Sequence, residues 1–494
     1  MLQRLFFTLL ICSTLLTTAQ AANSATKATQ PNVVFILIDD MGWKDLGCFD
    51  AKLYETPHID ALCKEGMRFT QAYTSTAICS PARATALTGK HPMKMRMWNH
   101  QHYIPVGQKI LPAYLKEKGY QNWHVGKWHL GSKKAKTYPT DIGFDVNRGG
   151  CEAWGPGSYF WPYNCKKSVD QDGNEVWQGI LRNSVPGMAA GGKEGEYLTD
   201  RLAEEAVKLI KNRDKNKPFY LNFWHYAVHN KKEAKAELVE KYEKKIEKLG
   251  IEPSFRLDKP TGSKLVASET NAVYAAMLES LDDAVGQVVE LLKKEGEYDN
   301  TLFIFFSDNG STTDSVPCVP LNGGKNSTYE GGVRVPAFVT WKGHVKPETT
   351  YNRPVYLGDV FNTVLDATGC KLPKNYDGDG LSWLPLFEGK ELPKRKFVWY
   401  FPDTRRKWAQ RANVAIYDEE SGLKFLLYLD GSPDELYDID ADLPEAKNIL
   451  KEKPEAAAAL KKELITYLKK YYPAMPKAPK QYAKVLERRL KSGE

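Results

Sequence analysis

Four stretches of continuous apolar, β-prone sequence, each followed at once by polar residues, most constrain the fold of this chain. A continuous rather than alternating run is typical of a strand that is buried on both faces of a parallel sheet. Between the runs, apolar residues recur at three- and four-residue spacing, most clearly over 198–212 and 271–294, which predicts helices. The runs are Val33–Ile38, Tyr120–Val125, Phe219–Trp224 and Leu302–Phe306. This alternation predicts an α/β domain with a large, mainly parallel or mixed sheet sandwiched by helices.

The polar residues that follow these runs indicate one common site. In open α/β sheets, ligands bind beyond the carboxyl ends of the strands. Four strand ends carry ionisable or carboxamide side chains, so residues far apart in the sequence are predicted to meet on one rim. These ends are Asp39-Asp40, Lys127 with His129, His225 with His229, and Asp308-Asn309.

The sequence changes character after about residue 390. Short aromatic and alternating runs over 397–401, 414–417 and 423–429 predict a small antiparallel sheet. The segment Pro454–Tyr471 has a helical pattern. A chain of 494 residues is long enough for one large domain and a smaller one. We predict an α/β domain at 32–390 and a C-terminal subdomain with the small sheet and the helix at 391–494.

The amino terminus has the pattern of an export signal. A short basic start is followed by an apolar stretch over 5–16 and by the small-x-small site Ala19-Gln20-Ala21. This stretch is shorter than the roughly 20 residues that span a bilayer. Cys12 lacks the small residues that precede a lipidation site. We therefore expect a secreted or periplasmic protein with a signal peptide at 1–21, a linker at 22–31 and no stable membrane association.

Charge and cysteine content narrow the functional classes. The formal net charge of +8 is mild for this length, and Lys and Glu are interleaved, as over 231–248. That run is typical of a solvated helix face, so we expect no nucleic-acid partner and a weak preference for anionic substrates. Seven of the eight cysteines follow the signal peptide, an odd number that leaves one thiol to explain in an oxidising compartment. Cys151 and Cys165 could close a local loop.

The acidic strand ends predict a metal site. Three carboxylates and a carboxamide that converge on one rim would repel one another unless a cation lay among them. Ligands that are all oxygen select a hard ion, calcium first and magnesium second, and argue against zinc. The alternative for each residue alone is capping or hydrogen bonding within a loop. The proposed ligands are Asp39, Asp40, Asp308 and Asn309.

Four segments carry a resemblance to a known family. Cys79-Ser80-Pro81-Ala82-Arg83, followed by Leu87-Thr88-Gly89, resembles the Cys-x-Pro-x-Arg signature of type I sulfatases, the formylglycine-dependent, arylsulfatase-like branch of the alkaline-phosphatase superfamily. Gly126–Gly131 resembles the second signature of that family. Segment 323–336 resembles its later core segment, and Leu436-Tyr437-Asp438 its C-terminal closing motif.

The resemblance implies an alkaline-phosphatase-like fold, with the catalytic domain at 32–390, and sulfuric ester hydrolysis. It implies that a formylglycine-generating maturation enzyme oxidises Cys79 to 3-oxoalanine (formylglycine), whose hydrate is a geminal diol. One hydroxyl of the diol attacks sulfur, and the other later loses its proton as sulfate leaves and the aldehyde reforms. One calcium ion is implied at the four oxygen ligands named above, completed by the modified Cys79 and a sulfate oxygen.

The resemblance also implies roles for the remaining polar residues. Arg83 holds the diol, Lys127 bridges diol and sulfate, and His129 takes the diol proton. His229 and Lys325 contact sulfate, and one of them protonates the leaving oxygen; these are chemistries that suit His and Lys. Pro81 suits the first turn of a helix, which would place Cys79 at the positive end of that helix. His225 is expected to pack or to support the residues that touch the substrate. Asn230-Lys231 replaces the Thr-Pro that is common in the family.

The substrate is predicted as a sulfated carbohydrate. Export, a large scaffold and the aromatic segment Tyr159–Tyr163 favour a sugar, since aromatic faces offer flat apolar area; ordinary loop packing is the alternative for that segment. Two other functions stay open. One is a phosphatase or phosphodiesterase on the same scaffold, and the other is a catalytically silent protein that binds sulfated glycans.

Overall fold

The computed structural model describes residues 30–99, 103–169, 173–180, 183–257, 264–313, 316–402, 412–471, 485 and 488–489. The predicted signal peptide and all but the last two residues of the predicted linker lie outside these ranges. Across the described ranges, every helix is too short or too polar to cross a membrane.

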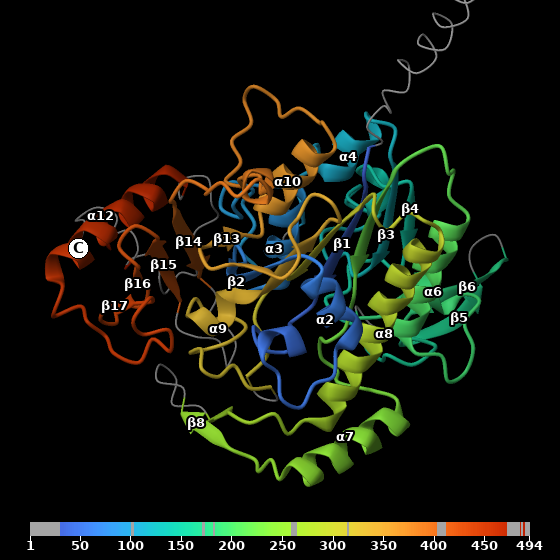
Figure 1. Cartoon of the computed structure of the whole chain (residues 1–494), viewed down its shortest axis with the longest axis horizontal. Coiled ribbons are helices and arrows are strands. Elements are labelled where there is room, and N and C mark those ends of the chain that lie inside the picture. Colours follow the sequence, from blue (N-terminus) through green and yellow to red (C-terminus); the bar gives the residue numbers. More distant parts are fainter. Residues whose placement is uncertain are drawn as a thin grey trace, which may run out of the picture.

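A nine-stranded mixed sheet forms the centre of the molecule (Figure 1). Its order is β12-β2-β11-β10-β1-β7-β3-β4, and β13 also pairs with β2. In the described sheet, β11 alone runs antiparallel to its neighbours. The strands are β1 (Asn32–Ile38), β2 (Met67–Tyr73), β3 (Gln121–Gly126), β4 (Val146–Arg148), β7 (Phe219–Trp224), β10 (Thr301–Ser307), β11 (Arg334–Thr340), β12 (Thr349–Tyr351) and β13 (Val355–Tyr356). The four predicted runs are thus the four consecutive strands β10-β1-β7-β3.

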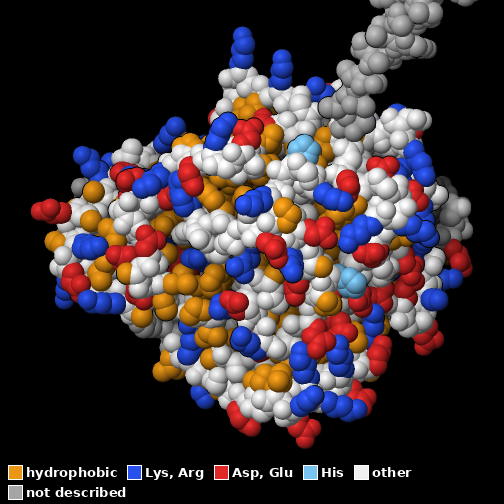
Figure 2. All heavy atoms as spheres, in the orientation of Figure 1, with side chains coloured by type: hydrophobic (Ala, Val, Ile, Leu, Met, Phe, Trp, Pro, Cys, Tyr) orange, Lys and Arg blue, Asp and Glu red, His pale blue; other side chains and the backbone are white. Residues whose placement is uncertain are grey.

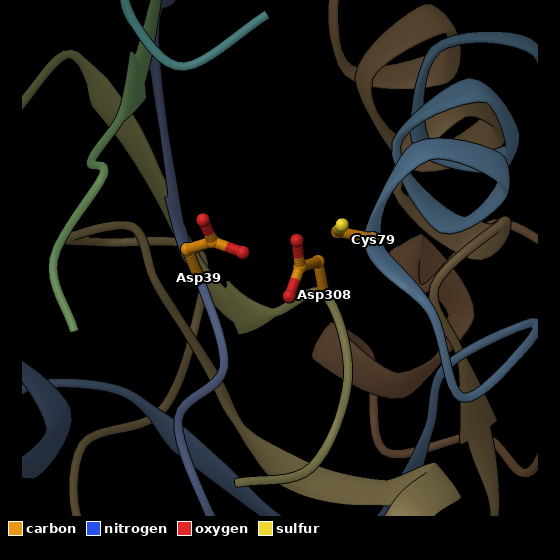
Figure 3. A group of neighbouring side chains, drawn as sticks. All are labelled: Asp39, Cys79 and Asp308. Atoms are coloured by element: carbon orange, nitrogen blue, oxygen red, sulfur yellow. The ribbon is translucent and has the colours of Figure 1, made fainter. Parts of the chain in front are cut away.

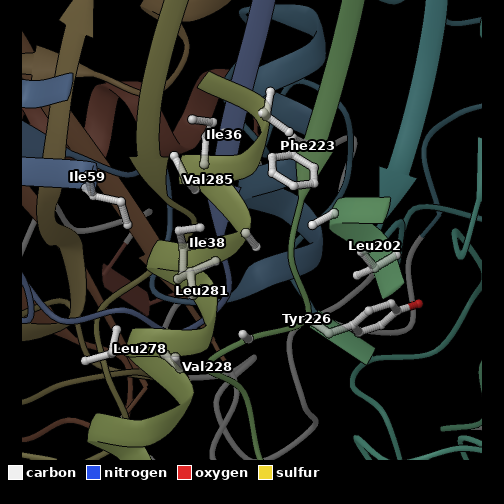
Figure 4. Packing of buried hydrophobic residues seen from close by; sticks show 14 of the residues in the cluster. Ile36, Ile38, Ile59, Leu202, Phe223, Tyr226, Val228, Leu278, Leu281 and Val285 are labelled. Atoms are coloured by element: carbon white, nitrogen blue, oxygen red, sulfur yellow. The ribbon is translucent and has the colours of Figure 1, made fainter. Parts of the chain in front are cut away.

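Helices cover both faces of this sheet, which explains the continuous apolar runs. Alternate residues of β1 enter opposite cores: Ile36 and Ile38 pack with α8, as Figure 4 shows, while Phe35 and Leu37 enter the second core. The first core includes α2 (Pro57–Lys64), α6 (Leu198–Lys211) and α8 (Ala272–Lys294); the second includes α3 (Cys79–Thr88), α4 (Leu111–Lys116) and α10 (Asp359–Ala367). The predicted α/β sandwich is confirmed.

Short elements and hairpins decorate this core. The highly charged helix α7 buries only Tyr242, in keeping with the solvated face that its sequence predicts. On the side shown in Figure 2, basic and acidic side chains are interspersed. These elements are η1 (Gly47–Phe49), η2 (Pro139–Asp141), α5 (Pro186–Ala189), α7 (Ala236–Leu249), α9 (Glu330–Val333), α11 (Leu384–Phe387), β5 (Cys165–Val169), β6 (Glu175–Gly179), β8 (Phe255–Leu257) and β9 (Lys264–Val266).

The C-terminal part forms the predicted antiparallel sheet and helix. The sheet is buried on both faces: Leu427 lies in the cluster with Leu464 of α12, whereas Leu426 lies in the cluster with Tyr73 of the central sheet. The elements are β14 (Lys396–Phe401), β15 (Asn413–Asp418), β16 (Leu423–Tyr428), β17 (Glu435–Asp438) and α12 (Pro454–Tyr471). The boundary near residue 390 stays a prediction.

A fully buried ion cluster joins this sheet to α9. Lys424 Nζ lies 2.8 Å from Glu330 Oε1 and 3.0 Å from Glu445 Oε1, and all three side chains are inaccessible to solvent. Removing Lys424 takes away the cation that both carboxylates share and leaves Glu330 with Arg334 Nη1 at 3.4 Å; breaking a buried pair in this way costs about 3–5 kcal/mol. We therefore expect Lys424→Met to lower the free energy of unfolding by roughly that amount, measured by urea denaturation. Lys396→Met breaks the exposed pair with Glu463 and should cost less than about 1 kcal/mol. Equal losses in both variants would contradict this account.

The same cluster predicts a dependence of stability on pH. Burial raises the pKa of Glu445 to about 8, and Glu330 adds to the rise while Lys424 opposes it. The unfolded chain has the ordinary value of 4.5, so the native state binds more protons between these values. This contribution to stability is full below pH 4.5 and is lost as the pH rises through the folded value. Glu445→Gln should therefore flatten the fall in unfolding free energy between pH 5 and 8; an unchanged slope would count against it.

Candidate active site

The carboxyl ends of the central strands bring the predicted site residues together. Asp39, Asp308 and Cys79 arrive from β1, β10 and the start of α3, and their side chains face a common space (Figure 3). Ligand atoms of these three residues lie within 4.8 Å of one another, and so do those of Asp39, Asp40 and His229. All of these side chains are nearly or fully buried, as are Arg83, Lys127, His129, Asn309 and Lys325.

Cys79 occupies the first position of a helix, as its sequence context predicts. Helix α3 begins at Cys79, with Pro81 in its first turn. The positive end of the helix dipole favours negative charge at this position. Cys79 Sγ lies 3.3 Å from His129 Nδ1, so a base is in direct contact with the predicted nucleophile.

Two cations organise one half of the acidic set. Arg83 Nε donates to Asp308 Oδ2 at 2.9 Å, and its Nη2 lies 3.6 Å from Asp39 Oδ1. Lys127 Nζ donates to the other oxygen of Asp39 at 2.5 Å. Because Arg83 lies one turn after Cys79 on α3, the helix positions the nucleophile and this carboxylate clamp together.

Asp40 centres the other half. Lys325 Nζ lies 2.6 Å from Asp40 Oδ1, and the same oxygen accepts from Asn309 Nδ2 at 2.7 Å. His229 Nε2 lies 3.6 Å from Asp40 Oδ2. Asp40 and His129 have φ angles of 63° and 57°, a region that non-glycine residues occupy rarely and often at functional sites.

The acidic set fits a hard cation. Asp39 Oδ1 and Asn309 Oδ1 are buried oxygens without a hydrogen-bond partner among the described residues. Burial raises the pKa of Asp39 well above its usual range although Lys127 lowers it, and burial likewise raises the pKa of Asp308. Buried acceptors that lack donors, together with carboxylates whose charge is costly to bury, are what a divalent cation would satisfy.

The basic residues around Asp40 have shifted pKa values. Burial lowers the pKa of His229, and the nearby Lys325 lowers it further. For Lys325 burial opposes the shift, but the carboxylate of Asp40 raises its pKa. In the same way, Lys325 and His229 hold the pKa of Asp40 below its usual range against the effect of burial. The site therefore holds a charged lysine next to a neutral histidine.

Two scaffold residues explain the local geometry. Gly126 has φ of 107°, and a Cβ there would lie 1.8 Å from Trp224 O; this close approach lets Lys127 N donate to the same oxygen at 2.7 Å. Tyr159 is fully buried, and its hydroxyl donates to Tyr226 O and His229 O. Tyr163 is also fully buried. The segment Tyr159–Tyr163 therefore packs and positions His229, and its prediction as a sugar-binding surface is wrong for these two tyrosines.

Three further observations refine the sequence predictions. Both ring nitrogens of His225 are buried and have no hydrogen-bond partner within the part of the chain that the structure describes, and burial lowers its pKa to about 3, in keeping with a packing role. Cys151 and Cys165 do not form a disulfide, so the predicted local loop closure is not made. Sequence reasoning missed Trp154, which is 45% exposed and packs against the ring of His229. A lone tryptophan in a loop carries no signal that would have singled it out.

A family model described as Sulfatase matches residues 31–370. The chain belongs to the sulfatase family. This confirms the type I sulfatase resemblance and makes the protein a sulfuric ester hydrolase. A second model, for the C-terminal part of N-sulphoglucosamine sulphohydrolase, matches residues 324–471 of this sulfatase.

Individual relatives support the same assignment. The N-acetylgalactosamine-6-sulfatase of Homo sapiens is 30% identical over 393 residues, which cover 76% of this chain and 69% of the relative. The crystal structure of Ps i-CgsB in complex with k-i-k-neocarrahexaose has a TM-score of 0.72 at 28% identity, and covers 89% of this chain and 93% of its own. The phosphonate monoester hydrolase of Agrobacterium radiobacter shares the fold alone, with a TM-score of 0.66 at 19% identity over 89% of this sulfatase and 96% of its own chain.

Proposed function

We propose that this sulfatase hydrolyses sulfate esters of a glycan, with Cys79 converted to formylglycine as the source of the nucleophile and one calcium ion as cofactor. The observation that carries the proposal is the position of Cys79, at a helix start, in contact with His129 and within 4.8 Å of the ligand atoms of Asp39 and Asp308. A nucleophile, a base and a set of oxygen ligands thus share one buried space.

The residues of the site divide the chemistry among them. Asp39, Asp40, Asp308 and Asn309 would hold the calcium ion, which when bound polarises the sulfuryl oxygens. His129, beside Cys79, takes the proton of the second hydroxyl when sulfate is expelled. Lys127, Arg83 and Lys325 offer positive charge to the sulfate oxygens and to the hydrated Cys79 derivative. Lys325 or His229, which both lie at Asp40, protonates the departing alcohol.

Charge balance favours an anionic substrate with a bound cation. Arg83, Lys127 and Lys325 offset the three carboxylates of the site, so a divalent ion would bring the net charge to about +2. A sulfate monoester carries one negative charge and is attracted to such a site. The glycan assignment rests on the relatives, whose names include an N-acetylgalactosamine-6-sulfatase and a complex with a neocarrahexaose.

The phosphatase alternative has weaker support. A dinuclear zinc centre would need further His and Asp ligands. Among the described residues, the groups of candidate metal ligands at this rim contain one histidine, His229, beside oxygen and sulfur donors, while His129 lies against Cys79. The phosphonate hydrolase shares the scaffold only, so it does not favour phosphorus chemistry here.

Maturation and export complete the proposal, with the protein secreted or periplasmic and Cys79 oxidised by a formylglycine-generating enzyme. Mass spectrometry of protein purified from its native host tests both, through the peptide that contains Cys79 and through the amino-terminal peptide. We expect the mass of formylglycine or its hydrate, and a mature amino terminus after residue 21. An unmodified thiol in protein that still hydrolyses esters would refute the mechanism and bring the phosphatase reading forward.

A further inference from the structure

A large cleft adjoins the catalytic centre. It has a volume of about 1260 Å³, above the roughly 300–1,000 Å³ typical of pockets for one small molecule. Its walls come from segment 132–138, which follows His129, from residues 151–153, and from strand β6. The backbone N–H of His129 donates to Cys151 O at 3.0 Å. The wall of the cleft is therefore hydrogen-bonded directly to the loop that carries His129.

The loop between the cleft and the catalytic centre presents an exposed aromatic face. Trp154 directly follows Ala153 of the cleft wall, and its ring centroid lies 5.5 Å from that of His229. Gly155 lets the loop approach this closely, because a Cβ there would lie 2.4 Å from His229 Nδ1. Because His229 is one of the two residues proposed to protonate the departing alcohol, an indole against its ring would lie on the leaving-group side, and its flat surface suits a sugar ring.

The lining of the cleft combines aromatic and cationic groups. Trp177 and Tyr138 supply aromatic rings, and Lys133 and Lys134 are exposed. Lys133 Nζ lies 5.5 Å from the ring centroid of Tyr138, and Lys167 Nζ lies 6.0 Å from that of Trp177. Among the described residues, neither lysine has a carboxylate within ion-pair distance. The acidic lining residues are occupied: Glu175 pairs with Lys167, and Glu152 accepts from Tyr103. The lining that a ligand would meet is therefore dominated by aromatic rings and lysine ammonium groups.

We propose that this cleft binds the sugar units next to the sulfated one, with Trp154 and Trp177 as stacking surfaces and Lys133 and Lys134 as contacts for further anionic groups. The inference rests on the proposed function and names its substrate class. The enzyme acts on sulfated oligosaccharides several units long and discriminates against monosaccharide sulfates. Residues 151–154 connect the wall of the cleft to the catalytic centre, so we expect one glycan chain to occupy both.

The test compares substrates of different length. Kinetics are measured with 4-nitrophenyl sulfate and with disaccharides and hexasaccharides from sulfated galactan and sulfated galactosaminoglycan. We expect kcat/KM of the wild type to be at least about tenfold higher for a hexasaccharide than for the matching disaccharide. The double variant Lys133→Ala/Lys134→Ala and the single variant Trp177→Ala should each lower the ratio of kcat/KM for the hexasaccharide to that for 4-nitrophenyl sulfate by about tenfold.

Controls separate this inference from the proposed function. Lys166→Ala changes an exposed lysine of the same hairpin that does not line the cleft, and should leave the ratio unchanged. Melting temperatures show whether Trp177→Ala still folds; the exposed lysine pair carries the test if it does not. Equal kcat/KM for the disaccharide and the hexasaccharide, in protein that hydrolyses both, would overturn the inference. No hydrolysis of 4-nitrophenyl sulfate or of any glycan sulfate by protein with modified Cys79 would instead refute the proposed function.

Discussion

Replacing Cys79 by alanine is expected to lower kcat for sulfate ester hydrolysis by at least about 10³-fold, the scale on which enzymes lose activity with their nucleophile. The thiol lies at the start of α3 beside His129, and among the described residues it is the one cysteine in the ligand groups at this rim. Steady-state kinetics with an aryl sulfate measure the loss.

Cys370→Ala is the matched control, because it too removes one buried sulfur. Cys370 belongs to the second hydrophobic core and not to the active site. Both variants should show similar melting temperatures, and only Cys79→Ala should lose turnover. Retained activity in Cys79→Ala would exclude the proposed nucleophile. Wild-type protein that binds a sulfated glycan as tightly as Cys79→Ala does, and turns over no ester, would instead identify a silent binding protein.

Removing calcium should have the second large effect. We expect a calcium chelator to lower kcat at least about 10²-fold and to lower the melting temperature, because an ion that binds only the folded state stabilises it by about 2.7 kcal/mol at a hundredfold excess over Kd. In its absence Asp39 Oδ1 and Asn309 Oδ1 lose the partner that burial demands.

The thermal shift makes this prediction independent of activity. Adding calcium back should restore both the melting temperature and kcat, with magnesium less effective and zinc ineffective. Asn309→Ala removes one neutral oxygen and should raise the calcium concentration needed for the shift by about tenfold. Chelator-treated protein with unchanged melting temperature and activity would rule out the metal site.

The central sheet could be predicted because its strands are buried on both faces. This burial makes the runs around Val33–Ile38 and Leu302–Phe306 continuous and apolar, and their carboxyl ends place the polar residues on one rim. Strand β2 was not predicted from its pattern, because its residues Arg68 and Thr70 are only partly buried and break the apolar run. The hairpin β5-β6 is short and largely exposed, so it has little hydrophobic pattern to detect.

Side-chain roles that depend on contacts distant in sequence could not be predicted. The segment Tyr159–Tyr163 has the composition of a sugar-binding loop, yet the hydroxyl of Tyr159 donates to the backbone carbonyls of Tyr226 and His229. Trp154, a few residues earlier, is the exposed ring. Tyr159 and Trp154 are both aromatic residues in loops of similar composition. Only the packing around each side chain shows that Tyr159 supports the scaffold and that Trp154 is exposed.

The contacts between α9 and the C-terminal sheet imply that the catalytic centre is completed late during translation. Lys325 lies five residues before Glu330, and between them Thr328 donates to Asn413 Oδ1 at 2.6 Å while Glu330 N donates to Glu445 at 2.7 Å. A ribosome builds the chain from its amino terminus. The C-terminal sheet, which supports the segment that carries Lys325, is therefore translated after all of the catalytic residues. A chain that stops before Glu445 would contain every proposed catalytic residue but would lack the contacts that position Lys325 in the active site.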